Sequence, residues 1–91
     1  MESNYYLQYF SLSYKHQPYA LAVLRRITLD DQRRGVSRTD GLSSVILSMR
    51  AWCTEKFGSE SKKGRWRNTG PLNTFRFRDQ TDAFEFKMRF G

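Results

Sequence analysis

Residues 74–91 read TFRFRDQTDAFEFKMRFG, and aromatic and charged side chains alternate through most of this stretch. Successive side chains of a strand point to opposite faces, so a strand over Thr74–Arg78 separates two phenylalanines from two arginines. The phenylalanines are Phe75 and Phe77, and the arginines are Arg76 and Arg78. The pattern predicts a small apolar core on one face, beneath a basic surface on the other.

The end of this stretch is compatible with two structures. Aromatic or apolar residues at 84, 86, 88 and 90 alternate with charged ones, which favours a strand. Asp79 and Asp82 can instead begin a helix, and Ala83, Phe86 and Phe90 would then share one face. The alternation alone favours the strand, and the sequence leaves the structure of residues 82–90 open.

The clearest predicted element is an amphipathic helix from Leu42 to about Phe57. Thr39 or Asp40 is placed to cap its beginning, and Gly58 to end it. Apolar side chains recur at helical spacing and form one stripe: Leu42, Val45, Ile46, Met49, Trp52 and Cys53. We expect this stripe to pack against a sheet.

The N-terminal half is less regular. Tyr5–Tyr14 is aromatic and free of charge, which predicts a buried strand. Tyr19–Leu29 fits a helix or a strand, and we favour a strand paired with the first one. Asp30–Gly41 is a polar, charge-mixed connector, which predicts a mobile loop.

Further along, Arg65–Arg67 is typical of a short strand and Asn68–Pro71 of a turn. Together the elements predict one α+β domain over residues 1–91, a small antiparallel sheet with one main amphipathic helix, about 42–57, packed on one face. A chain of 91 residues is long enough for one such domain.

The composition favours an anionic partner. Sixteen Lys and Arg residues against nine Asp and Glu give a net charge of +7. Arginine binds phosphates and carboxylates with two parallel hydrogen bonds, so nucleic acid and acidic protein surfaces are the partners to expect. The single Cys53 forms no intrachain disulfide, the polar N-terminus does not resemble a signal peptide, and no apolar run is long enough to span a membrane. These features predict a cytoplasmic protein without a membrane partner.

The sequence offers little for catalysis. His16 and Cys53 are the only soft metal ligands, whereas zinc sites ordinarily use three or four. Cys53 lies on the apolar stripe of the helix, where a cysteine usually behaves as a small hydrophobic residue. Motifs of nucleotide and serine hydrolases are missing. We therefore expect a binding protein with no catalytic residue, metal or cofactor, and not an enzyme.

The candidate binding surface is the basic segment around one predicted hairpin. Its cations lie close in sequence: Lys62, Lys63, Arg65, Arg67, Arg76 and Arg78. Arg33 and Arg34 of the connector can extend this patch or point elsewhere. Trp66 would stack on a base if exposed and would fill the core if buried, and burial is favoured in so small a domain.

A pattern in the last 40 residues resembles small proteins of tailed bacteriophages. It consists of Trp52-Cys53, Phe57-Gly58, Arg65-Trp66, Phe75-x-Phe77 and finally Asp82-Ala83-x-x-Phe86-Lys87. The resemblance implies a phage origin, a location in the host cytoplasm and a short helix over the Asp82–Lys87 segment. It carries no catalytic chemistry.

Three functions are compatible with these features. The favoured one is binding of nucleic acid, DNA or RNA, through the arginine and aromatic surface. The second is a phage effector that inhibits a host protein by binding its acidic surface. The third is a subunit of a larger assembly that associates through Tyr5, Tyr6 and Tyr9. The oligomeric state is open.

Overall fold

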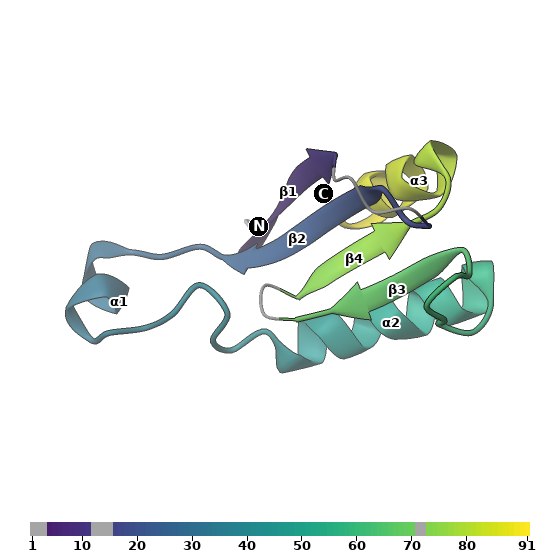
Figure 1. Cartoon of the computed structure of the whole chain (residues 1–91). Helices are drawn as coiled ribbons and strands as arrows, with labels where there is room; N and C mark the ends of the chain where they lie inside the picture. Colours follow the sequence, from purple (N-terminus) through teal and green to yellow (C-terminus); the bar gives the residue numbers. More distant parts are fainter. Residues whose placement is uncertain (1–3, 12–15, 71–72) are drawn as a thin grey trace.

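The computed structural model describes residues 4–11, 16–70 and 73–91. The elements follow one another in the order β1 (Tyr5–Ser11), β2 (Tyr19–Arg25), α1 (Leu29–Arg33), α2 (Ser43–Phe57), β3 (Trp66–Thr69), β4 (Thr74–Phe77) and α3 (Gln80–Phe90) (Figure 1). The predicted α+β class is confirmed.

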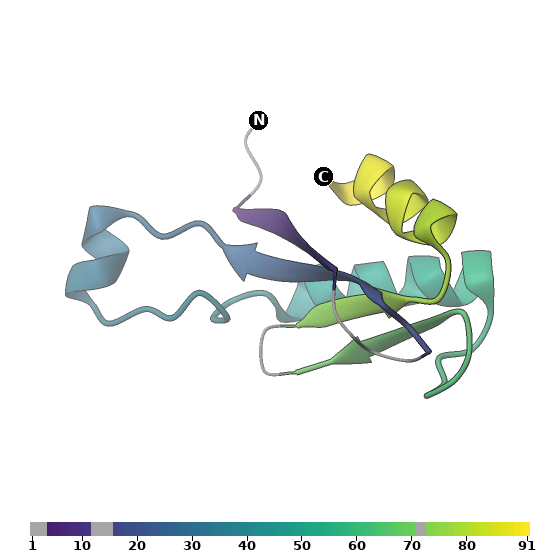
Figure 2. The same ribbon diagram turned by 45° about the horizontal axis from the view of Figure 1, so that its top comes forward.

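The four strands form one antiparallel sheet in the order β1-β2-β4-β3. Helix α3 packs against β2 and β4, and helix α2 against β3. Both helices contribute to one core cluster with the same face of the sheet, and the opposite face carries no helix (Figure 2). A single layer of helices therefore covers one side of the sheet.

The core is a cluster of aromatic rings between the sheet and the helices. Phe75 and Phe77 of β4 are fully buried, as the alternation predicted. Their ring centroids lie 4.8 and 5.3 Å from that of Phe86 in α3. Trp66 of β3 stacks on Phe75 at 6.2 Å. Phe86 thus joins the helix layer to the centre of the sheet.

The preference for a strand over residues 82–90 was wrong, because this segment lies in helix α3. Helical spacing buries Ala83 and Phe86 and leaves Phe84 and Met88 exposed. β4 already has a neighbour on both sides, so a strand here would have needed another edge. Asp82 in the first turn also complements the positive end of the helix dipole.

Helix α2 confirms the predicted main helix but begins differently. Its N-cap is Leu42, whose side chain cannot cap, so the proposed caps Thr39 and Asp40 were wrong. The Asp40 carboxylate instead accepts from the backbone N–H of Ser37 at 2.8 Å. Gly58 ends the helix with φ 90°, a conformation that glycine adopts without strain.

The N-terminal half forms the predicted strand pair, with β1 and β2 antiparallel. β1 is half-buried rather than buried, because it lies at an edge of the sheet. The predicted continuation of this strand to Tyr14 falls outside the described residues.

The connector was predicted as a loop, yet Leu29–Arg33 forms helix α1. Thr28 and Asp31 make reciprocal side-chain and backbone hydrogen bonds of 3.1 Å, a capping box that stabilises so short a helix. α1 projects away from the sheet at one end of the molecule (Figures 1 and 2).

Candidate functional site: a basic hollow on the helix-free face

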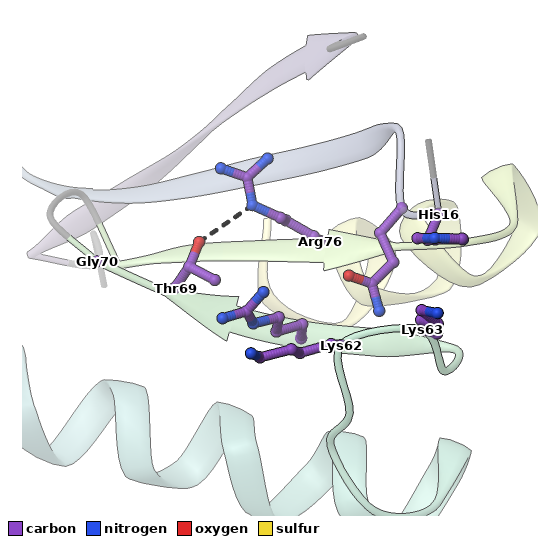
Figure 3. A pocket seen from close by; sticks show the side chains of 8 residues that line it. His16, Lys62, Lys63, Thr69, Gly70 and Arg76 are labelled. Carbon is purple, nitrogen blue, oxygen red and sulfur yellow. Dashed lines mark hydrogen bonds between the residues drawn. The ribbon is translucent and has the colours of Figure 1, made fainter. Parts of the chain in front are cut away.

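A hollow of about 510 Å³ opens beside β3 and β4 (Figure 3). We call it the basic hollow, and its lining residues are His16, Gln17, Lys62, Lys63, Arg67, Thr69, Gly70 and Arg76. Among these described residues none carries a carboxylate, whereas four are lysines or arginines. The hollow therefore combines concavity with a lining rich in lysine and arginine, which suits an anionic ligand.

The sheet register places two of the arginines side by side. Arg67 of β3 is the cross-strand partner of Arg76 of β4. Since Phe75 and Phe77 point into the core, their neighbour Arg76 points to the helix-free face. The Arg76 Nε–H donates to the Thr69 hydroxyl at 3.1 Å, which ties together two residues that line the hollow (Figure 3).

The two lysines come from the loop between α2 and β3, and Gln17 holds this loop in place. The buried Gln17 amide donates to the carbonyl of Ser61 at 2.9 Å and to that of Gly64 at 3.0 Å. These carbonyls flank Lys62 and Lys63 on either side. One side chain before β2 therefore fixes the lysine loop beside the sheet.

A second anchor lies at the start of the same loop. The indole N–H of Trp66 donates to the Gly58 carbonyl at 2.7 Å. Glu60 accepts from the Arg50 guanidinium and from the backbone N–H of Asn68, both at 2.6 Å. Glu60 is thus paired with Arg50 and is not among the residues that line the basic hollow.

The hollow unites four predicted site residues, Lys62, Lys63, Arg67 and Arg76. Arg65 does not join them. Its guanidinium makes two hydrogen bonds of 3.0 Å to the buried Asp82 carboxylate of α3, and this bonding raises the pKa of Arg65. Arg65 also lies over the Phe57 ring at 4.9 Å. Arg65 and Arg67 therefore do not share the hollow, since β3 begins only at Trp66 and strand alternation does not extend to Arg65.

Trp66 was the candidate for base stacking, with burial as the favoured alternative. The structure confirms burial, since the side chain is 1% exposed. Its ring packs among the core residues, so it cannot stack on a ligand.

The remaining predicted cations lie elsewhere. Arg78 is exposed just beyond the end of β4 and is not part of the lining of the hollow. Arg33 and Arg34 belong to or follow α1, where Arg34 forms an ion pair of 2.9 Å with Asp31. They do not extend the basic hollow.

Sequence reasoning missed His16 and Gln17 as site residues. They precede β2, far from the lysine loop in sequence, and only the pairing of β2 with β4 brings them to the hollow. A polar pair directly before Pro18, the residue that precedes β2, is too weak a signal to indicate this.

Cys53 was considered as a nucleophile or metal ligand. Its side chain is fully buried, and burial raises the pKa of the thiol to about 12. His16 is exposed at the hollow, so the two side chains are in different environments. Over the described residues, no group of three or more His, Cys, Asp or Glu side chains is arranged to hold a metal ion.

The described helices are each too short or too polar to traverse a bilayer. No family model matches the chain, and no curated protein or solved structure is significantly similar to it.

Proposed function

We propose that the protein binds nucleic acid without catalysis and that the phosphate backbone occupies the basic hollow. The observation that carries this proposal is the convergence of four lysine and arginine side chains on a lining without carboxylates. A guanidinium group can form two parallel hydrogen bonds to phosphate oxygens, and the lysine ammonium groups add electrostatic attraction. A concave site of this kind suits a phosphate better than the flat surface of an acidic protein.

The surroundings of the hollow favour a polymer over a single small anion. Phe10, Ala20, Arg76 and Arg67 follow one another across the sheet as cross-strand partners. Two strand spacings, about 10 Å, separate the half-buried Phe10 ring from Arg76 on the helix-free face. This separation places a ring within reach of a base whose phosphate lies in the hollow.

More cations occur farther along the same face. Tyr6 lies on β1 four residues before Phe10, about 14 Å along the strand. The Arg26 guanidinium lies over its ring at 5.8 Å, and the Arg38 guanidinium donates to its hydroxyl at 2.7 Å. A nucleic acid crossing the helix-free face would meet positive charge at both ends of its path.

The experiment is a salt titration of binding to a fluorescent single-stranded oligonucleotide and to its duplex. Two variants each lower the net charge from +7 to +5: Lys62→Ala/Lys63→Ala at the hollow and Arg33→Ala/Arg34→Ala at α1. For a single strand we expect the hollow variant to reduce the log–log salt slope by about 1.4, since each lost phosphate contact contributes about 0.7. The α1 variant should keep the slope of the wild type.

Equal effects of the two variants would mean that overall charge, rather than the hollow, drives binding. Failure to bind either oligonucleotide at low salt would reject the proposal. In that case a single acidic protein retained from a nuclease-treated bacterial lysate would support the effector function instead.

A further inference from the structure

The two edges of the sheet are protected very differently. At the β3 edge two outward backbone groups already have partners, because Asn68 N–H donates to Glu60 and Trp66 C=O accepts from Ser61 N–H at 3.3 Å. At the other edge, β1 has β2 as its only strand partner in the described part of the chain. The seven residues of β1 include no charged residue and no proline, the usual devices that prevent pairing with another chain.

The hydrogen-bond pattern defines which backbone groups point outward from β1. The N–H of Arg26 donates to the Asn4 carbonyl at 2.9 Å, so these two residues face each other in a hydrogen-bonded pair. Such pairs alternate along antiparallel strands. The backbone groups of residues 6, 8 and 10 therefore point toward β2, and those of residues 5, 7 and 9 point away from it.

The far side of β2 supports this assignment. Val23 and Arg25, the partners of residues 7 and 5, direct their N–H groups away from β1. Val23 donates to the Asn73 carbonyl at 3.3 Å, and Arg25 to that of Arg38 at 2.6 Å. Tyr5, Leu7 and Tyr9 consequently present outward N–H and C=O groups on an open edge.

We propose that a second copy of this chain pairs with this edge, antiparallel through β1, with the two-fold axis at Gln8. Tyr5 then lies opposite Ser11 of the second copy, and Leu7 lies opposite Tyr9. Every outward backbone group meets another outward group, and the helices of both copies lie on the same side. The product is a continuous sheet with four strands from each copy.

The register is determined by geometry rather than chosen freely. A two-fold axis perpendicular to the sheet preserves its faces, so odd residues pair only with odd residues. A two-fold axis at Gln8 pairs all seven residues of β1 with the second copy. An axis at any other residue of β1 would leave residues at the ends of the strand unpaired.

Charge and shape both favour a second copy as the occupant. Two copies carrying +7 each repel one another, and an uncharged strand is where they can approach with least repulsion. An acidic peptide would find no cation on β1 itself, although Lys87 and Arg26 lie beside this strand. Two hollows border β1 on the helix side, about 210 Å³ beside Tyr9 and Phe84 and about 250 Å³ beside Leu7 and Phe90. In the proposed dimer Leu7 of the second copy enters the hollow beside Tyr9, and Tyr9 of the second copy enters the hollow beside Leu7.

The first test is Gln8→Cys. Residues at the axis form a non-hydrogen-bonded pair with Cα atoms about 4.5 Å apart, which is within disulfide reach. We expect a disulfide-linked dimer under mild oxidation, while the buried native Cys53 stays unreactive. Ser48→Cys, also at an exposed position but on α2, is the control and should form little disulfide-linked dimer. Equal cross-linking of the two variants would overturn the proposal.

The second test measures mass by sedimentation equilibrium, from micromolar to millimolar nuclease-treated protein. Tyr9 is 45% exposed, and Tyr9→Lys places a charge on the edge, so we expect the dimer dissociation constant to rise by about tenfold or more. Leu47→Lys, at an exposed position of α2, is the matched control and should leave it unchanged. A wild-type monomer at millimolar concentration or a dimer unaffected by Tyr9→Lys would each overturn the proposal.

Discussion

On the helix-covered face of the sheet, Arg65 is held by two hydrogen bonds to Asp82, whereas on the helix-free face Arg67 borders a hollow whose lining has no carboxylate. The two arginines flank the same buried tryptophan and look equivalent in the sequence. Their difference shows that the number of cations indicates little about function. What distinguishes them is whether the fold supplies a carboxylate partner.

The largest expected effect tests whether the helix-covered face is where stability resides. Phe86→Ala removes the ring that contacts Phe75 and Phe77 and should destabilise the fold by about 3–5 kcal/mol. That is enough to unfold most of a domain this small. Phe84→Ala changes the same residue type on the same helix, but the Phe84 side chain is 61% exposed, so its effect should stay within about 0.5 kcal/mol. Chemical denaturation followed by circular dichroism measures both, and similar midpoints would contradict the packing described for α3.

The phenylalanines of β4 and α3 show how much of the fold the sequence could predict. Alternation identified β4 correctly, because Phe75 and Phe77 are buried on one side of a strand. The same alternation in residues 84–90 predicted a strand wrongly, since the pattern also contains the helical spacing of Ala83, Phe86 and Phe90. Periodicity in so short a segment does not distinguish a strand from a helix. The decision depends on which sheet edges are free, and that is a tertiary property.

The candidate site was predictable in part for a similar reason. Lys62, Lys63, Arg67 and Arg76 lie near one hairpin in sequence, so local reasoning could group them. The grouping failed for Arg65, because its Asp82 partner comes from a segment that had been assigned to a strand. His16 and Gln17 were missed because only the long-range pairing of β2 with β4 brings them there.

A crossed pair of variants tests the comparison of the two arginines directly. Arg65→Ala leaves the buried Asp82 carboxylate without its guanidinium partner and should destabilise the fold by about 1–3 kcal/mol, with little change in nucleic-acid binding. Arg67→Ala should leave stability within about 0.5 kcal/mol and weaken binding. Thermal unfolding and oligonucleotide titration of both proteins provide the four measurements. A binding loss in Arg65→Ala as large as that in Arg67→Ala would remove the distinction.

Gln17→Ala sharpens the comparison by changing the site without changing its charge. The loss of the hydrogen bonds to the Ser61 and Gly64 carbonyls should cost about 1 kcal/mol of stability. Because the lysine loop is then less fixed, affinity should fall while the salt slope stays close to that of the wild type. Gln32→Ala, an exposed position of α1, is the matched control. An unchanged affinity would mean that Lys62 and Lys63 need no positioning.

The smallest effect concerns α1, where the pairing of Arg34 and Arg25 with the Asp31 carboxylate can be tested by pH. Asp31 lies 2.9 Å from Arg34 and 3.6 Å from Arg25. The hydrogen bond from the Thr28 backbone is the largest cause that holds the pKa of Asp31 below its ordinary value of 3.8, and the arginines contribute less.

The pKa of Asp31 is lower in the folded protein than in an unfolded chain. The stabilisation that the Asp31 carboxylate contributes is therefore present above about pH 4 and is lost as the pH falls through the folded pKa. An NMR titration of the Asp31 carboxyl should therefore have its midpoint below 3.8. In Arg34→Ala most of the shift should remain, because the Thr28 bond persists. A wild-type midpoint at or above the ordinary value would show that α1 lacks its capping box in solution.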